Sequence, residues 1–168
     1  FVDADLATEA GAFYDLVENI ENYDGIIASR YIKGAIVKPK QNIQRIIASR
    51  IFNFMARALF LLPFHDTQLG AKLFKRKVIK EILPSLGVTD WAFDVDLLYQ
   101  CKRKGFKIKE RATIWHDIEG SKLNLKKQSI KMPLSIIRLR FAHSRFRFII
   151  KIYETILPEF LKIHHRLK

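Results

Sequence analysis

The first thirty residues, FVDADLATEAGAFYDLVENIENYDGIIASR (residues 1–30), carry the pattern that decides the fold. A short hydrophobic run ends in Asp-x-Asp at residues 3–5, and residues 9–21 follow with the apolar spacing of a helix. Residues 25–30 form a second short apolar run, as in a buried strand. Strand, helix and strand in this order predict a βαβ unit, and therefore a protein of the α/β class.

Asp3 and Asp5 stand where the first apolar run ends, the edge at which open α/β sheets place their ligands. Because side chains two apart in a strand point the same way, both carboxylates face one site. A divalent cation that shares a phosphate ligand needs only one or two such carboxylates. An aspartyl phosphatase also has two acids at this spacing, and a strand end with a helix cap at Thr8 needs no ligand. The motif alone leaves these three interpretations open.

The rest of the chain continues the alternation. Apolar spacing predicts helices over 43–62, 77–83 and 93–104, and short apolar runs over 71–74 and 106–108 resemble strands. Pro63 ends the first of these helices and Gly105 the last, in which Leu97, Leu98 and Cys101 face inward. The apolar positions of the helix over 43–62 include Ile43, Ile46, Ile47, Phe54, Leu61 and Leu62.

Composition and charge restrict the possible number of domains, the use of cysteine and the kind of partner. The 168 residues suit one domain, and the single cysteine excludes a disulfide framework and cannot by itself build a zinc site. The net charge is +13, yet residues 1–29 contain seven acids and no Lys or Arg. Residues 121–168 contain twelve Lys or Arg against two acids, so we expect an anionic partner. That partner could be nucleic acid, a phosphorylated substrate or acidic lipid.

Six motifs occur in a fixed order along the chain: DADLAT (3–8), SRY (29–31), Arg45 with Ser49, Asn53 and Arg57, DTQLGAKLFKR (66–76), WAFDVDLLY (91–99) and WHDIEGSKL (115–123). This ordered set resembles the family 2 glycosyltransferases, and within them the polyprenyl-phosphate branch that includes the dolichyl-phosphate β-glucosyltransferases and mannose synthases. The resemblance covers roughly residues 1–140. It implies a GT-A, Rossmann-like fold whose earlier, nucleotide-binding strands precede Asp-x-Asp. We therefore expect residues 1–128 to be the carboxyl-terminal part of a catalytic domain.

The resemblance assigns roles to individual residues. Asp3 and Asp5 match the ligands of Mg²⁺ or Mn²⁺, and Asp5 also belongs to the catalytic centre. Asp94 matches the acid that acts as base or orients the substrate, although a helix-start acid favoured by the dipole is the alternative. Arg30, Arg45 and Ser49 match positions that hold the acceptor phosphate, for which the planar fork of Arg is suited. The remaining substrate-binding candidates are Asp66, Gln68 and Lys122.

The basic segment 129–168 interleaves Ile, Leu and Phe with Lys and Arg, which is typical of an interfacial segment rather than a spanning one. We expect it to hold the protein at the cytoplasmic face of a membrane with an anionic surface. Its mixed apolar character and the lack of a known module argue against nucleic acid as a partner.

The function predicted from these motifs is inverting transfer of a hexose from UDP-glucose or GDP-mannose to dolichyl or polyprenyl phosphate. Glucose is the expected sugar, and it follows from the resemblance alone. A non-catalytic, basic α/β protein that binds a membrane or nucleic acid is the alternative.

Overall fold

The computed structural model describes residues 1, 7–8, 10–39, 42–87, 91–116, 125–146 and 148. Its larger sheet has β1 (Gly25–Ser29) at the centre, with β4 (Ile108–Ala112) parallel on one side and β3 (Lys72–Phe74) antiparallel on the other. A smaller sheet joins β2 (Ile36–Lys38) in parallel to β5 (Ile114–His116). The α/β prediction is confirmed, while the opening strand expected over residues 1–5 lies largely outside the described residues.

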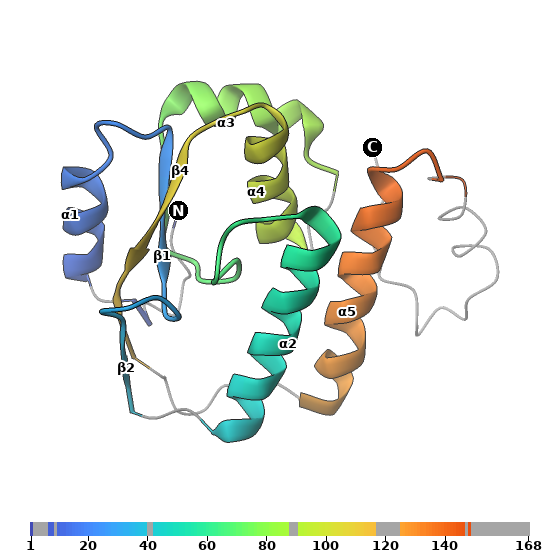
Figure 1. The fold of residues 1–168 in the computed structure, drawn as a ribbon, viewed down its shortest axis with the longest axis horizontal. Helices are drawn as coiled ribbons and strands as arrows, with labels where there is room; N and C mark the ends of the chain where they lie inside the picture. Colours follow the sequence, from blue (N-terminus) through green and yellow to red (C-terminus); the bar gives the residue numbers. More distant parts are fainter. Residues whose placement is uncertain are drawn as a thin grey trace.

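The helices cover both sides of the larger sheet (Figure 1). Helix α1 (Ala10–Glu18) lies on one side, whereas α2 (Ile43–Phe60), α4 (Phe93–Arg103) and α5 (Leu125–Ala142) lie on the other. Helix α3 (Arg76–Ile82) runs on into a short 3-10 turn at Leu83–Ser85. The helices predicted over 9–21, 43–62, 77–83 and 93–104 are all present, with ends that differ by a few residues.

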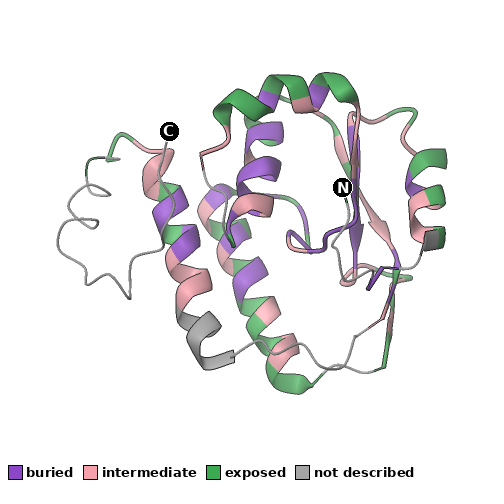
Figure 2. Ribbon diagram, turned by 180° about the vertical axis from the view of Figure 1, so that it is seen from behind, coloured by how far each residue is buried: buried purple, intermediate pink, exposed green. Residues whose placement is uncertain are grey.

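The main core lies between β1 and the helices on the α2 side (Figure 2). All five residues of β1 are buried, which explains why its sequence is a continuous apolar run rather than an alternating one. Leu97, Leu98 and Cys101 are buried as predicted. Gly105 has a φ of +75°, a conformation that glycine adopts without strain, so α4 can end there.

Helix α2 begins at the cap residue Asn42, whose side chain accepts a hydrogen bond from the Gln44 N–H. It ends at Phe60, because Leu61 takes a left-handed conformation with φ of 54°. The helix therefore stops before Pro63 rather than at Leu62. Its buried residues are Phe52, Asn53, Ala56 and Phe60.

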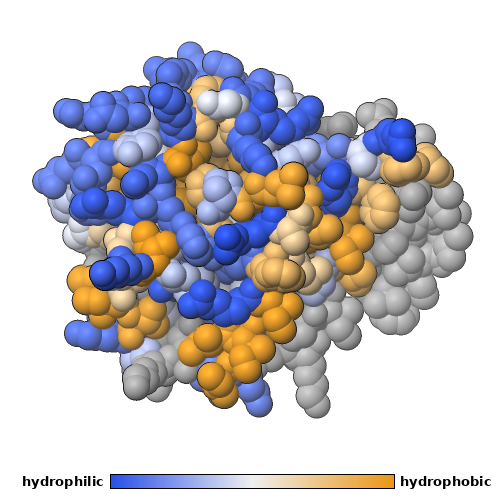
Figure 3. Space-filling view, in the orientation of Figure 1, coloured by the Kyte–Doolittle hydropathy of each residue, from blue (hydrophilic) through white to orange (hydrophobic). Residues whose placement is uncertain are grey.

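The side of α2 that faces away from the core is also apolar. We call it the outer face of α2; its members are each more than half exposed, and they are Ile43, Ile47, Ile51, Phe54 and Leu61. Figure 3 shows hydrophobic atoms gathered on the surface over the lower part of this helix. Most apolar positions named from the sequence thus lie on the exposed side, since the spacing fixes a stripe but not its direction.

Helix α5 crosses the predicted boundary between residues 128 and 129 and packs beside α2 (Figure 1). Ile136 and Leu139 are fully buried in the main core. The first part of the basic segment is therefore built into the domain. No helix within the described ranges is long and apolar enough to cross a membrane.

Candidate functional site

Several candidate residues meet at the loop of residues 65–71, which connects α2 to β3. Asn53 of α2 accepts hydrogen bonds from the Thr67 N–H and hydroxyl, at 2.7 and 2.9 Å from Oδ1. Glu110 of β4 accepts the N–H of Asp66 at 2.8 Å. These buried and partly buried contacts hold the loop from two sides, so the side chains it carries have fixed positions.

Arg30 and Asp66 form a bidentate ion pair at the end of β1. Arg30 Nε lies 2.7 Å from Asp66 Oδ2 and Nη2 lies 3.0 Å from Oδ1, and the Arg30 N–H also donates to Oδ2 at 3.1 Å. The Asp66 side chain is fully buried. Desolvation alone would raise the pKa of Asp66, but the charge and hydrogen bonds of Arg30 outweigh it and lower this pKa.

Two aromatic rings also contact the Arg30 guanidinium. Its central carbon lies 5.1 Å from the ring centre of Tyr31 and 5.2 Å from that of Trp115, distances typical of cation–π interactions. Asp66 occupies the Nε edge of the guanidinium. Arg30 is therefore held in one orientation before any ligand arrives.

The SRY segment is tied to α2 through a side-chain hydrogen bond. The Tyr31 hydroxyl donates to Ser49 Oγ at 2.7 Å, and Arg50 lies over the Tyr31 ring at 3.9 Å. Arg45 is half-buried and precedes Ser49 by one helical turn, so the two residues are neighbours on the helix. The structure thus brings Ser49 to the segment that contains Arg30, and Arg45 lies one turn from Ser49 on the same helix.

Asp94 and Asp96, both in the first turn of α4, have different surroundings. Asp94 Oδ1 accepts a hydrogen bond from Lys72 Nζ at 2.6 Å, and its side chain is 26% exposed. Asp96 is fully buried and accepts hydrogen bonds from His143 and the Gly87 N–H, at 2.7 and 2.8 Å. Of these two acids, only Asp94 can meet a ligand.

The two candidates from the 65–71 loop are also placed differently. Gln68 is partly exposed, and its N–H donates to Asp66 Oδ1 at 3.3 Å. The Asp66 carboxylate is buried, and both of its oxygens already accept hydrogen bonds, from Arg30 and from the Gln68 N–H. In this arrangement it orients Arg30 rather than a substrate. Sequence reasoning missed Lys72, although a lysine inside the apolar run 71–74 was a visible signal.

Asp3, Asp5 and Lys122 lie outside the described residues. Within the described ranges, no group of three or more His, Cys, Asp or Glu side chains could hold a metal ion. The metal site expected at Asp3 and Asp5 therefore stays a prediction.

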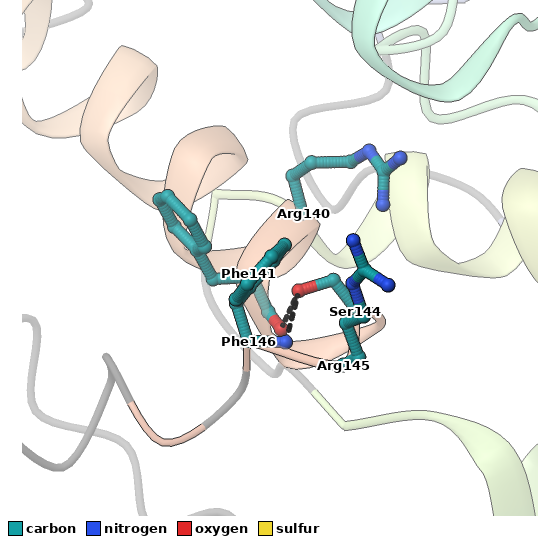
Figure 4. A pocket seen from close by; sticks show the side chains of 5 residues that line it. All are labelled: Arg140, Phe141, Ser144, Arg145 and Phe146. Carbon is teal, nitrogen blue, oxygen red and sulfur yellow. Dashed lines mark hydrogen bonds between the residues drawn. The ribbon is translucent and has the colours of Figure 1, made fainter.

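A separate hollow lies at the carboxyl-terminal end of α5 and contains none of the candidate residues (Figure 4). The guanidinium groups of Arg140 and Arg145 point to the same side of it. The turn beneath them is fixed by Ser144, whose hydroxyl donates to the Phe141 carbonyl and accepts the Phe146 N–H. The hollow thus combines two positive charges with two aromatic rings.

The chain is similar to several glucosyltransferases. It is 36% identical over 148 residues to "Dolichyl-phosphate beta-glucosyltransferase" of Dictyostelium discoideum. This alignment covers 84% of this chain and 45% of that protein. The protein of the same name from Saccharomyces cerevisiae is 42% identical over 78 residues, 46% of this chain and 23% of that protein. The human one is 40% identical over 98 residues, 57% of this chain and 30% of that protein.

The chain thus spans less than half the length of each of these three relatives. No protein-family model matches the chain, and no solved structure matches it.

Proposed function

Because the chain belongs to the family of the dolichyl-phosphate beta-glucosyltransferases, we propose that it contributes to glucosyl transfer from a nucleotide-sugar to dolichyl or polyprenyl phosphate. The chain would form the carboxyl-terminal part of a GT-A domain. The observation that carries the proposal is the hydrogen bond between Tyr31 and Ser49, which joins the segment of Arg30 to the helix of Arg45. This bond joins two parts of the chain that each carry an arginine, and arginines together with a serine hydroxyl suit a phosphate.

On the acceptor side, the lipid phosphate is itself an anionic nucleophile and needs charge neutralisation more than a strong base. Arg30 and Arg45 would supply this charge, and Ser49 a hydrogen bond. Since Asp66 fixes Arg30 before binding, little conformational freedom is lost when the phosphate arrives. A phosphate oxygen would then form a bond to the anomeric carbon as the bond to the nucleoside diphosphate breaks, with inversion.

On the donor side, Asp3, Asp5 and Lys122 would lie near the diphosphate of UDP-glucose, with GDP-mannose as the second candidate donor. A bound Mg²⁺ or Mn²⁺ supplies stabilisation of the negative charge on the leaving group. The Asp94 carboxylate is partly exposed and would orient a hydroxyl group of the sugar or the acceptor.

A lipid acceptor places the site near a membrane, and the outer face of α2 supports this position. Its five large apolar side chains occupy one stripe, beside the exposed Arg50 and Arg57. Helix α2 contains no acidic residue. An apolar stripe bordered by cations is suited to the interface of an anionic leaflet, where each basic group contributes about 1 kcal/mol.

The test is to incubate the full-length protein with UDP-glucose or GDP-mannose and a short polyprenyl phosphate, and to identify the products by mass spectrometry. We expect a lipid-linked hexose with UDP-glucose. Formation of a lipid-linked mannose would show that GDP-mannose, rather than UDP-glucose, is the donor. If neither donor gave a product, the proposal would be wrong and a non-catalytic membrane protein would be favoured.

A further inference from the structure

Lys72 lies on β3 with its side chain fully buried. Its Nζ donates to two oxygens, the Leu69 carbonyl and Asp94 Oδ1, each at 2.6 Å. Both contacts are short, as expected of hydrogen bonds from a charged donor. The ammonium group is thus directed from inside the protein to the carboxylate at the start of α4.

A buried lysine at this position lowers the stability of the fold unless its charge is compensated. Taking a charge out of water carries a large desolvation cost, and a well-packed apolar residue is often as stable or more stable. The neighbours of Lys72 along β3, Leu73 and Phe74, follow the apolar pattern that Lys72 breaks. A residue that breaks a local rule inside a core is characteristic of a functional site.

Lys72 also lies within electrostatic reach of the Arg30–Asp66 pair. Desolvation alone would raise the pKa of Asp66, whereas Arg30 and, to a smaller extent, Lys72 lower it. The positive charges of Arg30 and Lys72 therefore alternate with the negative charges of Asp66 and Asp94. This arrangement joins the segment of Arg30 to the first turn of α4 through the 65–71 loop.

The Asp94 carboxylate has one oxygen directed inward and a side chain that still reaches the surface. Within the described part of the chain, its Oδ1 is paired with Lys72 and its Oδ2 accepts no hydrogen bond. An aspartate at a helix start can rotate about two side-chain bonds, so an unpaired carboxylate would sample several positions. The contact with Lys72 restricts it to one.

We propose that Lys72 is a positioning residue, which holds Oδ1 of Asp94 in the interior so that Oδ2 can accept a hydrogen bond from a hydroxyl of the sugar or the acceptor. This inference rests on the proposed transferase function. Lys72 itself does not touch the substrate, because its side chain has no exposed surface. Correct placement of a reacting or orienting group within a fraction of an ångström is what such a residue supplies.

The test is a double-mutant cycle in the full-length protein with Lys72→Met, Asp94→Asn and the double variant. Methionine keeps the apolar length of lysine without its charge.

We expect each single variant to lower kcat about tenfold to a hundredfold, the effect of one charged hydrogen bond, while KM for the nucleotide-sugar changes little. The double variant should be no slower than Asp94→Asn alone. Lys77→Met is the matched control, since Lys77 is exposed and pairs with Asp24 away from the site, and it should keep wild-type kcat.

The outcomes separate this inference from the proposed function. If the wild-type protein transfers no sugar, the proposed function fails; if it is active but the two losses multiply in the double variant, only the role of Lys72 is overturned. A folded Lys72→Met with wild-type kcat would also overturn it. Thermal unfolding checks every variant, and Lys72→Gln replaces Lys72→Met if the latter does not unfold cooperatively. Should neither fold, an active Asp94→Asn would still contradict the proposal.

Discussion

Asp66 holds Arg30 through two parallel hydrogen bonds, 2.7 Å from Nε to Oδ2 and 3.0 Å from Nη2 to Oδ1, across 36 residues of sequence. The Asp66 side chain has no exposed surface, while the Arg30 side chain is 10% exposed. The pair therefore fixes the end of β1 against the 65–71 loop and leaves the arginine close to the surface.

We expect Asp66→Asn to lower the free energy of unfolding by about 3 to 5 kcal/mol, the cost of leaving one member of a buried ion pair without its partner. Urea titration followed by tryptophan fluorescence measures this change. A loss below about 1 kcal/mol would contradict the view that this pair supports the domain.

The Asp15–Arg111 pair is the exposed counterpart. Its geometry is as good, with 2.7 Å from Arg111 Nε to Asp15 Oδ2, yet the side chains are 38% and 42% exposed. Solvent screens such a pair, so Asp15→Asn should cost only about 0 to 1 kcal/mol, and less at high salt. Urea titrations at low and high salt check this. A loss of stability as large as that of Asp66→Asn would show that geometry, rather than burial, determines how much an ion pair contributes to the free energy of unfolding.

Acid should weaken the fold partly through Asp66. Its pKa in the folded protein lies below the ordinary value of 3.8, because Arg30 outweighs desolvation. A carboxyl group with a lowered folded pKa contributes stability above its unfolded pKa and loses this contribution as pH falls through the folded pKa. We therefore expect wild-type stability to decline below pH 3.8 more steeply than that of Asp66→Asn, in urea titrations from pH 6 to pH 2. Parallel curves would contradict the assignment.

Cys101 should be inert in the folded protein. Burial, with a smaller contribution from Asp24, raises the pKa of its thiol to about 12, so almost no thiolate exists near neutral pH. Iodoacetamide at pH 8 should label the unfolded chain rapidly and the folded one only through opening, as mass spectrometry would show. Equal labelling rates in the two states would exclude this burial.

The outer face of α2 should bind anionic lipid. Replacing Ile47 and Phe54 together with Ser should weaken binding to vesicles containing phosphatidylserine by at least about tenfold, since burying each side chain contributes about 1.5 to 3 kcal/mol. The matched control is Tyr14→Ser with Val17→Ser, two similarly exposed large hydrophobic residues of α1 across the sheet. Vesicle sedimentation measures both. Equal losses in the two double variants, or none, would exclude a specific role for α2.

Asp3 and Asp5 should hold a divalent cation. Changing either to Ala in the full-length protein should abolish turnover with Mg²⁺ or Mn²⁺ and weaken Mn²⁺ binding measured by electron paramagnetic resonance. Asp24→Ala is the control, because Asp24 pairs with Lys77. Unchanged Mn²⁺ binding in both variants would assign the cation to other residues.

Much of the fold and part of the site follow from local signals in the sequence. Apolar spacing located α1 to α4, and Gly105 marked the end of α4, because periodicity and backbone restriction act over a few residues. Helix α2 ends three residues before Pro63. The smaller sheet of β2 and β5 was not predicted. Helix α5 was not separated from the basic segment, because only packing against α2 distinguishes its buried Ile136 and Leu139.

The α/β class, the order of motifs and the resemblance to a glycosyltransferase family follow from residue type and spacing along the chain. Which side of α2 is buried, the exposure of Asp94 rather than Asp96, and the contacts of Lys72 with Asp94 and of Asp66 with Arg30 depend on the tertiary structure. The contacts of Lys72 with Asp94 and of Asp66 with Arg30 join residues 22 and 36 positions apart. No local pattern encodes such contacts, because burial and charge pairing arise only when the helices and strands pack together.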